Sequence, residues 1–178
     1  EWIKSLNTNL NISQLNAESK QLSRIIQLFN RTNQFNITGN KFSSSTLIKQ
    51  LNDPNKIYYF GHSFDRIGSE GIVSVLGFKK EDRTILVEEF ILSCRVFNRY
   101  IEVSMLKPLL EIAMKLSCSI EFKFKDTGRN KVAQKFISGN LINKGYISLS
   151  ALSKTYKEII NKPVNIINNL CEIESKFK

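Results

Sequence analysis

The sequence predicts an α/β (α+β) fold in which a single mixed, mostly antiparallel sheet is flanked by helices. Its length of 178 residues is typical of one domain. Segments whose apolar residues recur with a strand period alternate with segments of helical period. Three strand-like runs, 57–64, 71–78 and 84–92, follow one another across turn clusters at 65–70 and 79–83. This spacing predicts an antiparallel meander in the middle of the chain.

The first fifty residues predict one strand and two helices. Residues 9–15 alternate polar and apolar side chains, which is the period of a half-buried strand. Apolar residues between Leu22 and Phe29 fall on one stripe of a helix expected over 19–30. The other elements expected here are a loop over 33–40 and a short helix from Ser44 or Ser45 to Asp53.

The second half of the chain predicts helices that alternate with strands. One helix is expected over 102–116, with Pro108 either kinking it or marking a true start near Leu109. The later elements expected are a strand at 119–124, a helix over 130–142, a strand at 146–149, and a short helix or frayed tail over 165–178. We therefore expect residues 1–178 to form one domain, with a core over 1–160 and a C-terminal extension over 161–178.

Composition and charge narrow the classes of function. Lys and Arg outnumber Asp and Glu by 26 to 16, a net charge of +10, which predicts either a solvated basic surface or an anionic partner. No apolar run approaches the ~20 residues of a membrane span, and no basic helix or RNA motif is present. Neither a membrane nor a nucleic acid is therefore expected as a partner. One histidine and three cysteines without metal spacing predict no metal site, reduced thiols and a cytoplasmic location.

Three segments resemble the FkbH-like proteins: RIIQLFNRTNQFNIT at 24–38, DRIGSEGIV at 65–73 and FILSCRV at 90–96. The order of predicted elements is similar to that of the GNAT acyltransferase fold, and the resemblance covers most of residues 1–150. It implies a GNAT-like sheet that is splayed between its fourth and fifth strands. Proteins of this family typically join an N-terminal HAD-type phosphatase domain to such a domain. Because no HAD-type Asp-x-Asp motif occurs here, we expect the chain to be the C-terminal domain alone.

The resemblance also implies a site for coenzyme A or a phosphopantetheine thioester. In the GNAT fold, pyrophosphate binds free backbone N–H groups where a helix opens after the fourth strand. The residues implied here are Leu92, Arg95, Asn98, Arg99, Tyr100 and Ile101, together with Asn130, which begins an Asn-x-x-Ala-x-x-Phe pattern and would hold the pantetheine arm. The family carries Gly where Asn98 and Tyr100 stand, and Glu102 adds negative charge. We therefore expect coenzyme A to bind weakly or not at all.

Glu88 is the first candidate catalytic residue, because a carboxylate inside an otherwise apolar strand is costly unless it is paired or functional. Its functional interpretation is a general base for an incoming amine or thiol, and the resemblance also expects an acid at this position. The alternative is a structural ion pair across the sheet with Arg66, Arg83 or Lys79.

Cys94 is the second candidate catalytic residue. A thiol just before a basic loop and a helix start suits an acyl-carrying nucleophile. The alternative is a buried, apolar cysteine at the end of a strand. His62 is the only histidine, and it serves as a base for Cys94 only if its strand runs beside that of Cys94.

Thr32, Asn33, Gln34 and Phe35 are the candidate substrate-binding residues, because they form the most specific part of the resemblance. In the GNAT fold this loop lines the acceptor site. Polar amides beside one aromatic ring suit a polar acyl group or a phosphopantetheine arm. The alternative is a loop that is folded by its own side-chain hydrogen bonds.

The resemblance, together with these candidate residues, implies an acyltransferase domain that transfers a small hydroxyacyl or glyceryl group, as a thioester, to an acyl carrier protein. The expected partners are that acidic carrier protein, which a basic surface would steer, and the HAD-type phosphatase domain of the parent chain. Two alternatives stay open. One is an acetyl-CoA-dependent N-acetyltransferase with Glu88 as base, and the other is a non-catalytic GNAT module that binds a carrier protein or the phosphatase domain.

Overall fold

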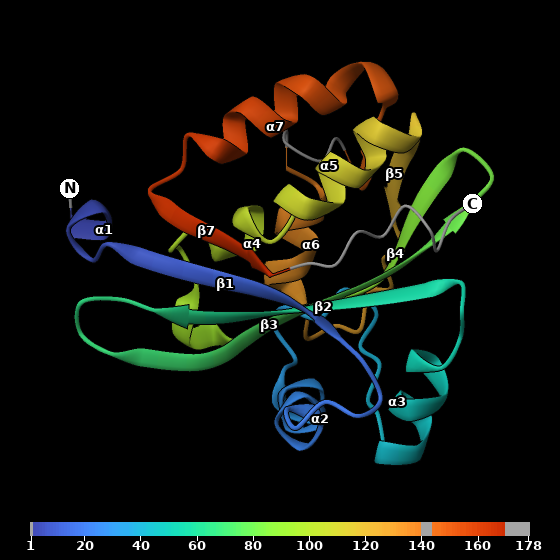
Figure 1. Ribbon diagram of the computed structural model, residues 1–178, viewed down its shortest axis with the longest axis horizontal. Coiled ribbons are helices and arrows are strands. Elements are labelled where there is room, and N and C mark those ends of the chain that lie inside the picture. Colours follow the sequence, from blue (N-terminus) through green and yellow to red (C-terminus); the bar gives the residue numbers. More distant parts are fainter. Residues whose placement is uncertain (1, 140–143, 170–178) are drawn as a thin grey trace.

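The computed structural model describes residues 2–139 and 144–169, which form one seven-stranded sheet with helices on both faces (Figure 1). The strands are β1 (Thr8–Leu15), β2 (Lys56–Phe64), β3 (Ser69–Glu81), β4 (Thr84–Leu92), β5 (Ser119–Phe122), β6 (Tyr146–Ile147) and β7 (Val164–Asn169). The α-helices are α1 (Trp2–Ser5), α2 (Leu22–Arg31), α3 (Ser44–Leu51), α4 (Ile101–Ser104), α5 (Lys107–Leu116), α6 (Lys131–Ile137) and α7 (Leu152–Ile160).

The sheet has the strand order β6-β5-β4-β3-β2-β1-β7. The pairs β1–β2, β2–β3, β3–β4 and β5–β6 are antiparallel, whereas β4–β5 and β1–β7 are parallel. The predicted mixed, mostly antiparallel sheet and its central meander are therefore confirmed.

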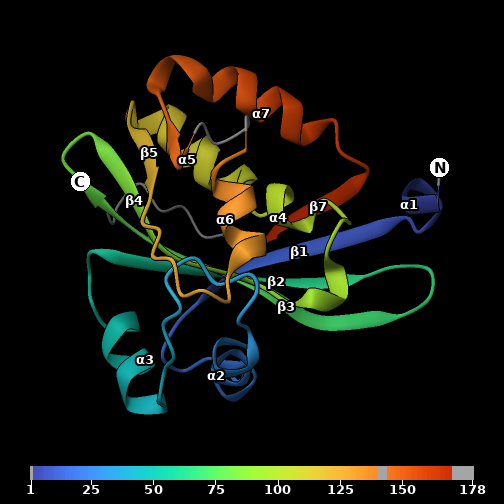
Figure 2. The same ribbon diagram turned by 180° about the vertical axis from the view of Figure 1, so that it is seen from behind.

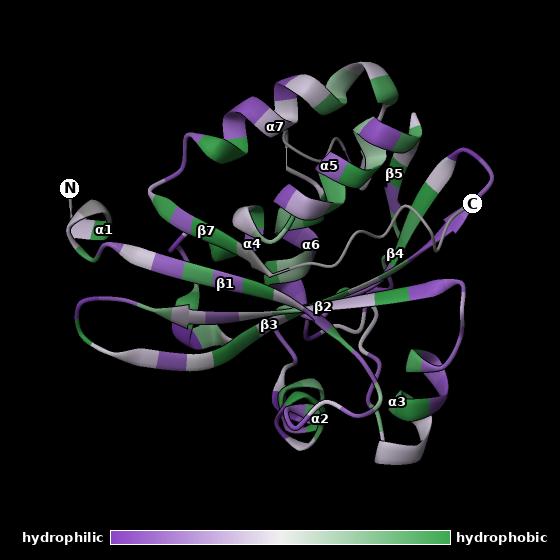
Figure 3. Ribbon diagram, viewed as in Figure 1, coloured by the Kyte–Doolittle hydropathy of each residue, from purple (hydrophilic) through white to green (hydrophobic). Residues whose placement is uncertain are grey.

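Helices α2 and α3 cover one face of the sheet, and α4 to α7 cover the other (Figure 1 and Figure 2). Ile25 and Phe29 of α2 are fully buried against the first face, as the predicted stripe requires. Ser43 caps α3 by accepting a hydrogen bond from the Thr46 amide at 3.2 Å. Along β1, hydrophobic and hydrophilic residues alternate (Figure 3), because successive side chains of a strand point to opposite faces.

Strands β4 and β5 separate after a short paired stretch, so the predicted splay between the fourth and fifth strands is present. Pairing covers Thr84–Val87 of β4 and Ser119–Phe122 of β5, while β4 continues to Leu92. The edge of β4 beyond this point is filled by residues 35–37. The Leu92 amide donates to the Phe35 carbonyl at 3.0 Å, and the Ile37 amide donates to the Phe90 carbonyl at 3.2 Å.

Several predicted boundaries were wrong. The helix expected over 102–116 is two helices, α4 and α5, and Pro108 lies in the first turn of α5, where its missing N–H costs no helical hydrogen bond. The helix expected over 130–142 ends at Ile137; residues 140–143 lie outside the described part of the chain. Other shifts include a later start of α2, at Leu22, and earlier ends of α3, β5 and β6, at Leu51, Phe122 and Ile147. Strand β3 is longer than the expected 71–78 at both ends.

The C-terminal part was also mispredicted. Residues 164–169 form β7, which pairs in parallel with β1 at the edge of the sheet, rather than a short helix or a frayed tail. Part of the range expected to be an extension, 161–178, thus belongs to the main sheet; residues 170–178 lie outside the described structure. The prediction failed because β7 needs a partner from the opposite end of the chain, which local periodicity does not reveal. Helices α1 and α7 were not predicted.

Candidate functional site

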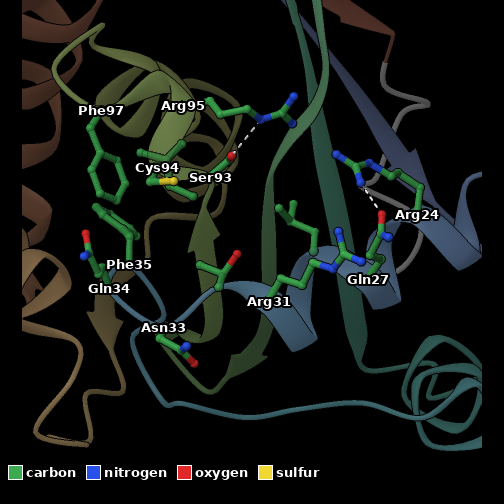
Figure 4. Close-up of a pocket in the computed structure, with 13 residues that line it drawn as sticks. Arg24, Gln27, Arg31, Asn33, Gln34, Phe35, Ser93, Cys94, Arg95 and Phe97 are labelled. Atoms are coloured by element: carbon green, nitrogen blue, oxygen red, sulfur yellow. Dashed lines mark hydrogen bonds between the residues drawn. The ribbon is translucent and has the colours of Figure 1, made fainter.

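A pocket of about 390 Å³ lies between α2, the loop that follows it, and the segment that follows β4 (Figure 4). It is lined by Arg24, Gln27, Leu28, Arg31, Thr32, Asn33, Gln34, Phe35, Leu92, Ser93, Cys94, Arg95 and Phe97. The pocket therefore brings together the four candidate substrate-binding residues, the candidate nucleophile Cys94, and two of the residues assigned to a cofactor, Leu92 and Arg95. Glu88, Asn98, Arg99, Tyr100, Ile101 and Asn130 do not line it.

Lys41 holds the loop that forms one wall of the pocket. Its ammonium group donates to the carbonyl oxygens of Phe29 at 2.9 Å and Thr32 at 2.8 Å, and to the Asn33 side chain at 3.0 Å. A cation at the C-terminal end of α2 also interacts favourably with the helix dipole. Burial lowers the pKa of Lys41. Sequence reasoning missed this residue, because a lysine in a polar loop carries no spacing signal.

Phe35 anchors the same loop in the core. Its ring is almost fully buried and packs edge-on against Phe90, with 5.2 Å between the ring centroids. The Phe136 ring lies at the same distance in a tilted orientation. The preceding residue, Gln34, accepts a hydrogen bond from the Ala133 amide at 3.1 Å through its carbonyl oxygen. Thus Phe35 fixes the loop, while the side chains of Asn33 and Gln34 stay exposed at the pocket.

Cys94 is exposed and begins a short 3₁₀ turn, Cys94–Val96, directly after β4. The alternative of a buried, apolar cysteine is therefore wrong for Cys94, although it describes Cys118, which is 1% exposed. Ser93 holds this turn, because its amide donates to the Val73 carbonyl at 2.7 Å and its hydroxyl accepts from Arg95 Nε at 3.2 Å. The thiol is thus presented to the pocket by a hydrogen-bonded backbone.

His62 does not lie beside Cys94. It belongs to β2 and pairs with Ile72 of β3, and β3 separates it from β4. Its Nε2 lies 3.0 Å from the Ser69 hydroxyl. The expectation that His62 could serve Cys94 as a base, which depended on neighbouring strands, is therefore wrong.

Glu88 forms ion pairs with three lysines outside the pocket. Its carboxylate lies 2.5 Å from Lys56, 3.6 Å from Lys79 and 3.9 Å from Lys123. Burial alone would raise the pKa of Glu88, but the hydrogen bond and charge of Lys56 and the other two lysines lower it below its ordinary value. The predicted pair with Lys79 is confirmed, whereas Arg66 and Arg83 are not among its ion-pair partners in the described residues. A carboxylate held in this way is a weak base.

Glu89 is a buried carboxylate that the sequence reasoning did not single out. It is 4% exposed and accepts hydrogen bonds from the Thr38 hydroxyl at 2.9 Å and from the Asn40 amide. Burial raises its pKa, and these two hydrogen bonds oppose the rise. Strand β4 has a bulge at Glu88. Gly77 of β3 pairs with Glu89 and the next residue, Phe78, pairs with Val87, so Glu88 is an extra residue and simple alternation fails there.

In the loop after β4, two residues with side chains stand at backbone conformations that glycine favours. Asn98 and Tyr100 both have φ of +62°, in the left-handed region. Lys162 Nζ lies 5.2 Å from the centroid of the Tyr100 ring. The following helix, α4, has only four residues. Burial raises the pKa of Glu102 at its start, and within the described residues Glu102 Oε2 is buried without a hydrogen-bond partner. These features disfavour an anionic cofactor at this loop.

Arg99 is paired within the protein. Its guanidinium lies 3.1 Å from Asp65 and 3.3 Å from Glu70, and the side chain of Asp65 is 3% exposed. The structure therefore uses Arg99 to join the β2–β3 turn to the loop after β4, instead of leaving it available for phosphate as the sequence predicted.

Asn130 also binds the chain itself. It is fully buried, and its amide donates to the carbonyl oxygens of Asn36 at 2.8 Å and Lys125 at 2.9 Å while it accepts from the Thr127 amide at 3.0 Å. Both of its donors are thus used to hold the segment that fills the edge of β4. The predicted role with a pantetheine arm would require this segment to move.

In the described part of the chain, no helix is long and apolar enough to cross a membrane. Among the same residues, no group of three or more His, Cys, Asp or Glu side chains could hold a metal ion.

Comparisons with known proteins establish the fold. No protein-family model and no curated protein matches the sequence significantly. The chain resembles the diaminobutyrate acetyltransferase of Paenibacillus lautus, solved with its substrate and coenzyme A, with a TM-score of 0.54 and 16% identity over 75% of each chain. It resembles a GNAT-family acetyltransferase of Staphylococcus aureus with a TM-score of 0.53 and 12% identity, over 74% of this chain and 82% of that one.

A third similar structure is the ribosomal-protein-S18-alanine N-acetyltransferase of Escherichia coli, with a TM-score of 0.52 and 11% identity over 73% of this chain and 76% of that chain. The chain therefore has the fold of the GNAT acetyltransferases, as the order of its elements predicted. The relation to FkbH-like proteins stays a prediction from the three sequence segments.

Proposed function

We propose that the chain is a GNAT-fold acyltransferase domain of the FkbH-like kind, which passes a small hydroxyacyl or glyceryl group, held as a thioester, to an acyl carrier protein. The observation that supports this most is the pocket. It combines an exposed thiol, Cys94, with the Thr32–Phe35 loop on which the resemblance depends most. The proposal includes a cytoplasmic setting, and a HAD-type phosphatase domain as a partner in the parent protein.

The proposed acyl transfer has two steps. In the first, Cys94 Sγ attacks the carbonyl carbon of the acyl donor, the bond to the leaving group breaks, and the thiol proton departs with that group. In the second, the thiol of the carrier protein's phosphopantetheine arm attacks the same carbonyl carbon. The bond to Cys94 breaks, and the proton of the incoming thiol returns to Sγ. Neither step needs an oxidant or a reductant.

The acetyl-CoA-dependent N-acetyltransferase is less well supported. Tyr100 places a Cβ and a ring at a left-handed position of the loop to which the resemblance assigns the pyrophosphate, and Glu102 follows it with a carboxylate. Residues 35–37 occupy the edge of β4 that an extended cofactor arm would need. Glu88, the base of that alternative, is held by three lysines. The same obstacles favour the non-catalytic module as the second candidate, because they leave the fold intact without a cofactor site.

Mass spectrometry of the intact protein tests the proposal. The chain is mixed with a carrier protein that bears a hydroxyacyl thioester, and the acyl group is located by peptide mapping. We expect acylation at Cys94, transfer to a second, unloaded carrier protein, and loss of both in Cys94→Ser. Cys118→Ser is the matched control, since Cys118 is buried and its sulfur hydrogen-bonds the Leu116 carbonyl.

The other outcomes would overturn the proposal. Full transfer by Cys94→Ser would exclude the covalent step. Acetylation of an amine from acetyl-CoA, without acylation by the carrier thioester, would establish the N-acetyltransferase. Binding of the carrier protein without any transfer would establish the non-catalytic module.

A further inference from the structure

Three arginines line the pocket, and two of them lie on one stripe of α2. Arg24 and Arg31 are seven residues apart, which corresponds to two helical turns and about 10 Å along the axis. Arg95 reaches the pocket from the opposite wall, after β4. In Figure 4 the guanidinium groups of Arg24 and Arg95 point toward each other across the pocket.

Two of these cations have no carboxylate partner among the described residues, and the third shares its partner with another arginine. No Asp or Glu is among the described residues that line the pocket. Arg24 hydrogen-bonds the neutral side chain of Gln27, and neither Arg24 nor Arg31 has an ion-pair partner among the residues that the structure describes. Arg95 lies 3.7 Å from Glu70, but Glu70 is shared with Arg99, which is closer at 3.3 Å. Three gathered cations repel one another unless an anion lies between them.

We propose that Arg24, Arg31 and Arg95 form a subsite for a phosphate group of the substrate. This inference rests on the proposed function for the identity of the pocket, and it adds the chemical class of what binds there. Guanidinium groups match phosphate oxygens with paired, charge-assisted hydrogen bonds, and three of them suit a group with several charged oxygens better than a single carboxylate. The exposed amides of Asn33 and Gln34 can donate to hydroxyl or carbonyl oxygens beside it.

The phosphate has two possible sources. One is a small phosphorylated substrate, and the other is the phosphopantetheine arm of a carrier protein. The volume of about 390 Å³ equals that of roughly a dozen water molecules, which suits a compact molecule with one phosphate group. Protection measured with free phosphate and with a carrier protein separates the two sources.

Protection of Cys94 from alkylation measures occupancy of this subsite without any turnover. The chain is treated with iodoacetamide, and the modification of Cys94 is followed by peptide mass spectrometry at increasing inorganic phosphate. Sodium chloride and sodium acetate at matched ionic strength are run in parallel, since general screening affects all exposed charges. We expect phosphate to slow the alkylation and the two other salts to leave it nearly unchanged.

Substitution of the arginines locates the effect. In Arg24→Gln or Arg31→Gln, the phosphate concentration that halves the alkylation rate rises about tenfold, because one charge-assisted interaction is lost. Arg31→Lys keeps the charge without the planar fork and falls between the wild type and Arg31→Gln. Arg83→Gln is the control, since the exposed Arg83 lies in the turn before β4, at the opposite end of that strand from Cys94.

Each remaining outcome has one meaning. Absence of protection, equal protection by chloride or acetate, or an equal loss in Arg83→Gln overturns the subsite. Protection by phosphopantetheine-bearing carrier protein but not by the carrier without its arm assigns the phosphate to the arm, whereas protection by free phosphate alone assigns it to a small substrate. Two further outcomes separate the subsite from the proposed function. If phosphate protects Cys94 but Cys94→Ser still transfers the acyl group, the subsite is supported and the proposed function is refuted. If the acyl group is transferred through Cys94 but phosphate gives no protection, the proposed function is supported and the subsite is refuted.

Discussion

Two basic regions lie near the end of β4: the loop that contains Arg99, and the pocket that contains Arg24 and Arg31. They differ in which groups compensate their positive charge. In the loop, Arg99 is bound by Asp65 and Glu70, and the adjoining helix start holds Glu102. In the pocket, Arg24 and Arg31 have no carboxylate partner among the described residues. The arginine of the loop that resembles a cofactor site is therefore compensated by the chain's own carboxylates, whereas two arginines of the pocket are not, within the described residues.

This difference shows that a basic residue near a site is informative only together with its partners. From the sequence, Arg99 was expected to bind phosphate and Arg31 was not, because the partners of neither residue are visible there. A half-buried arginine held by two carboxylates, one of them almost fully buried, is part of the folded structure, so breaking this cluster is expected to cost stability. An exposed arginine without a partner contributes little to folding, so its removal is expected to affect binding instead.

The largest effect is expected from Asp65→Asn. Asp65 Oδ1 accepts hydrogen bonds from the backbone amides of Ile67 at 2.8 Å and Gly68 at 3.2 Å. Asn keeps an oxygen for these two bonds, but it loses the ion pair with Arg99. Arg99 then keeps only Glu70 as an ion-pair partner in the described residues, and the free energy of unfolding should fall by about 2–3 kcal/mol, somewhat less than for a fully buried pair. Urea denaturation measures this change.

Two matched variants calibrate this result. Asp82→Asn alters an exposed aspartate in the other hairpin turn, and Arg31→Gln alters the open pocket; both should stay within about 0.5 kcal/mol of the wild type. If Arg31→Gln lowered stability as much as Asp65→Asn, the two regions would not differ in the way described.

A smaller loss is expected from Asn130→Ala, which removes the side chain that holds residues 35–37 against β4. Three hydrogen bonds disappear and buried groups stay unpaired, so the free energy of unfolding should fall by about 2 kcal/mol. Hydrogen exchange should quicken at the Ile37 and Leu92 amides, which form the bridge to β4. Asn165→Ala, at an exposed position in β7, should change neither quantity. Unchanged exchange at Ile37 would mean that Asn130 does not hold this segment.

The sequence predicted those parts of the structure that depend on local patterns. The central meander and α2 follow from alternation and from the helical stripe, whereas β7 was missed because it pairs with β1 from the other end of the chain. At the site, the structure brings Cys94, proposed from its place before a basic loop, and the 32–35 loop, taken from the resemblance, to one pocket; their roles stay predictions. The resemblance misplaced Arg99, because the carboxylate that binds it lies 34 residues away in the chain. Lys41 was missed for the same reason, since its role depends on carbonyl groups that only the fold brings together.

The smallest effect is expected from Glu89→Gln, and it concerns pH. Burial raises the pKa of Glu89 in the folded protein, so the folded state binds a proton more readily than the unfolded chain. As pH rises from about 4.5 through the folded pKa, Glu89 therefore lowers the stability of the protein. Glu89→Gln removes this decline, so its stability relative to the wild type should increase over that range. Urea denaturation at several pH values measures the difference.

The neighbouring carboxylate, Glu88, should affect the pH dependence of stability in the opposite direction. The pKa of Glu88 is lowered in the folded state because the lysine charges outweigh the effect of burial, so its contribution is fully present above about pH 4.5 and is lost as pH falls through the folded pKa. Glu88→Gln should therefore be less stable than the wild type near neutral pH, and the gap should close in acid. Glu88 is paired with lysines, whereas Glu89 is held by neutral hydrogen-bond donors. If the stabilities of Glu88→Gln and Glu89→Gln, relative to the wild type, changed in the same direction with pH, this difference would not control their titration.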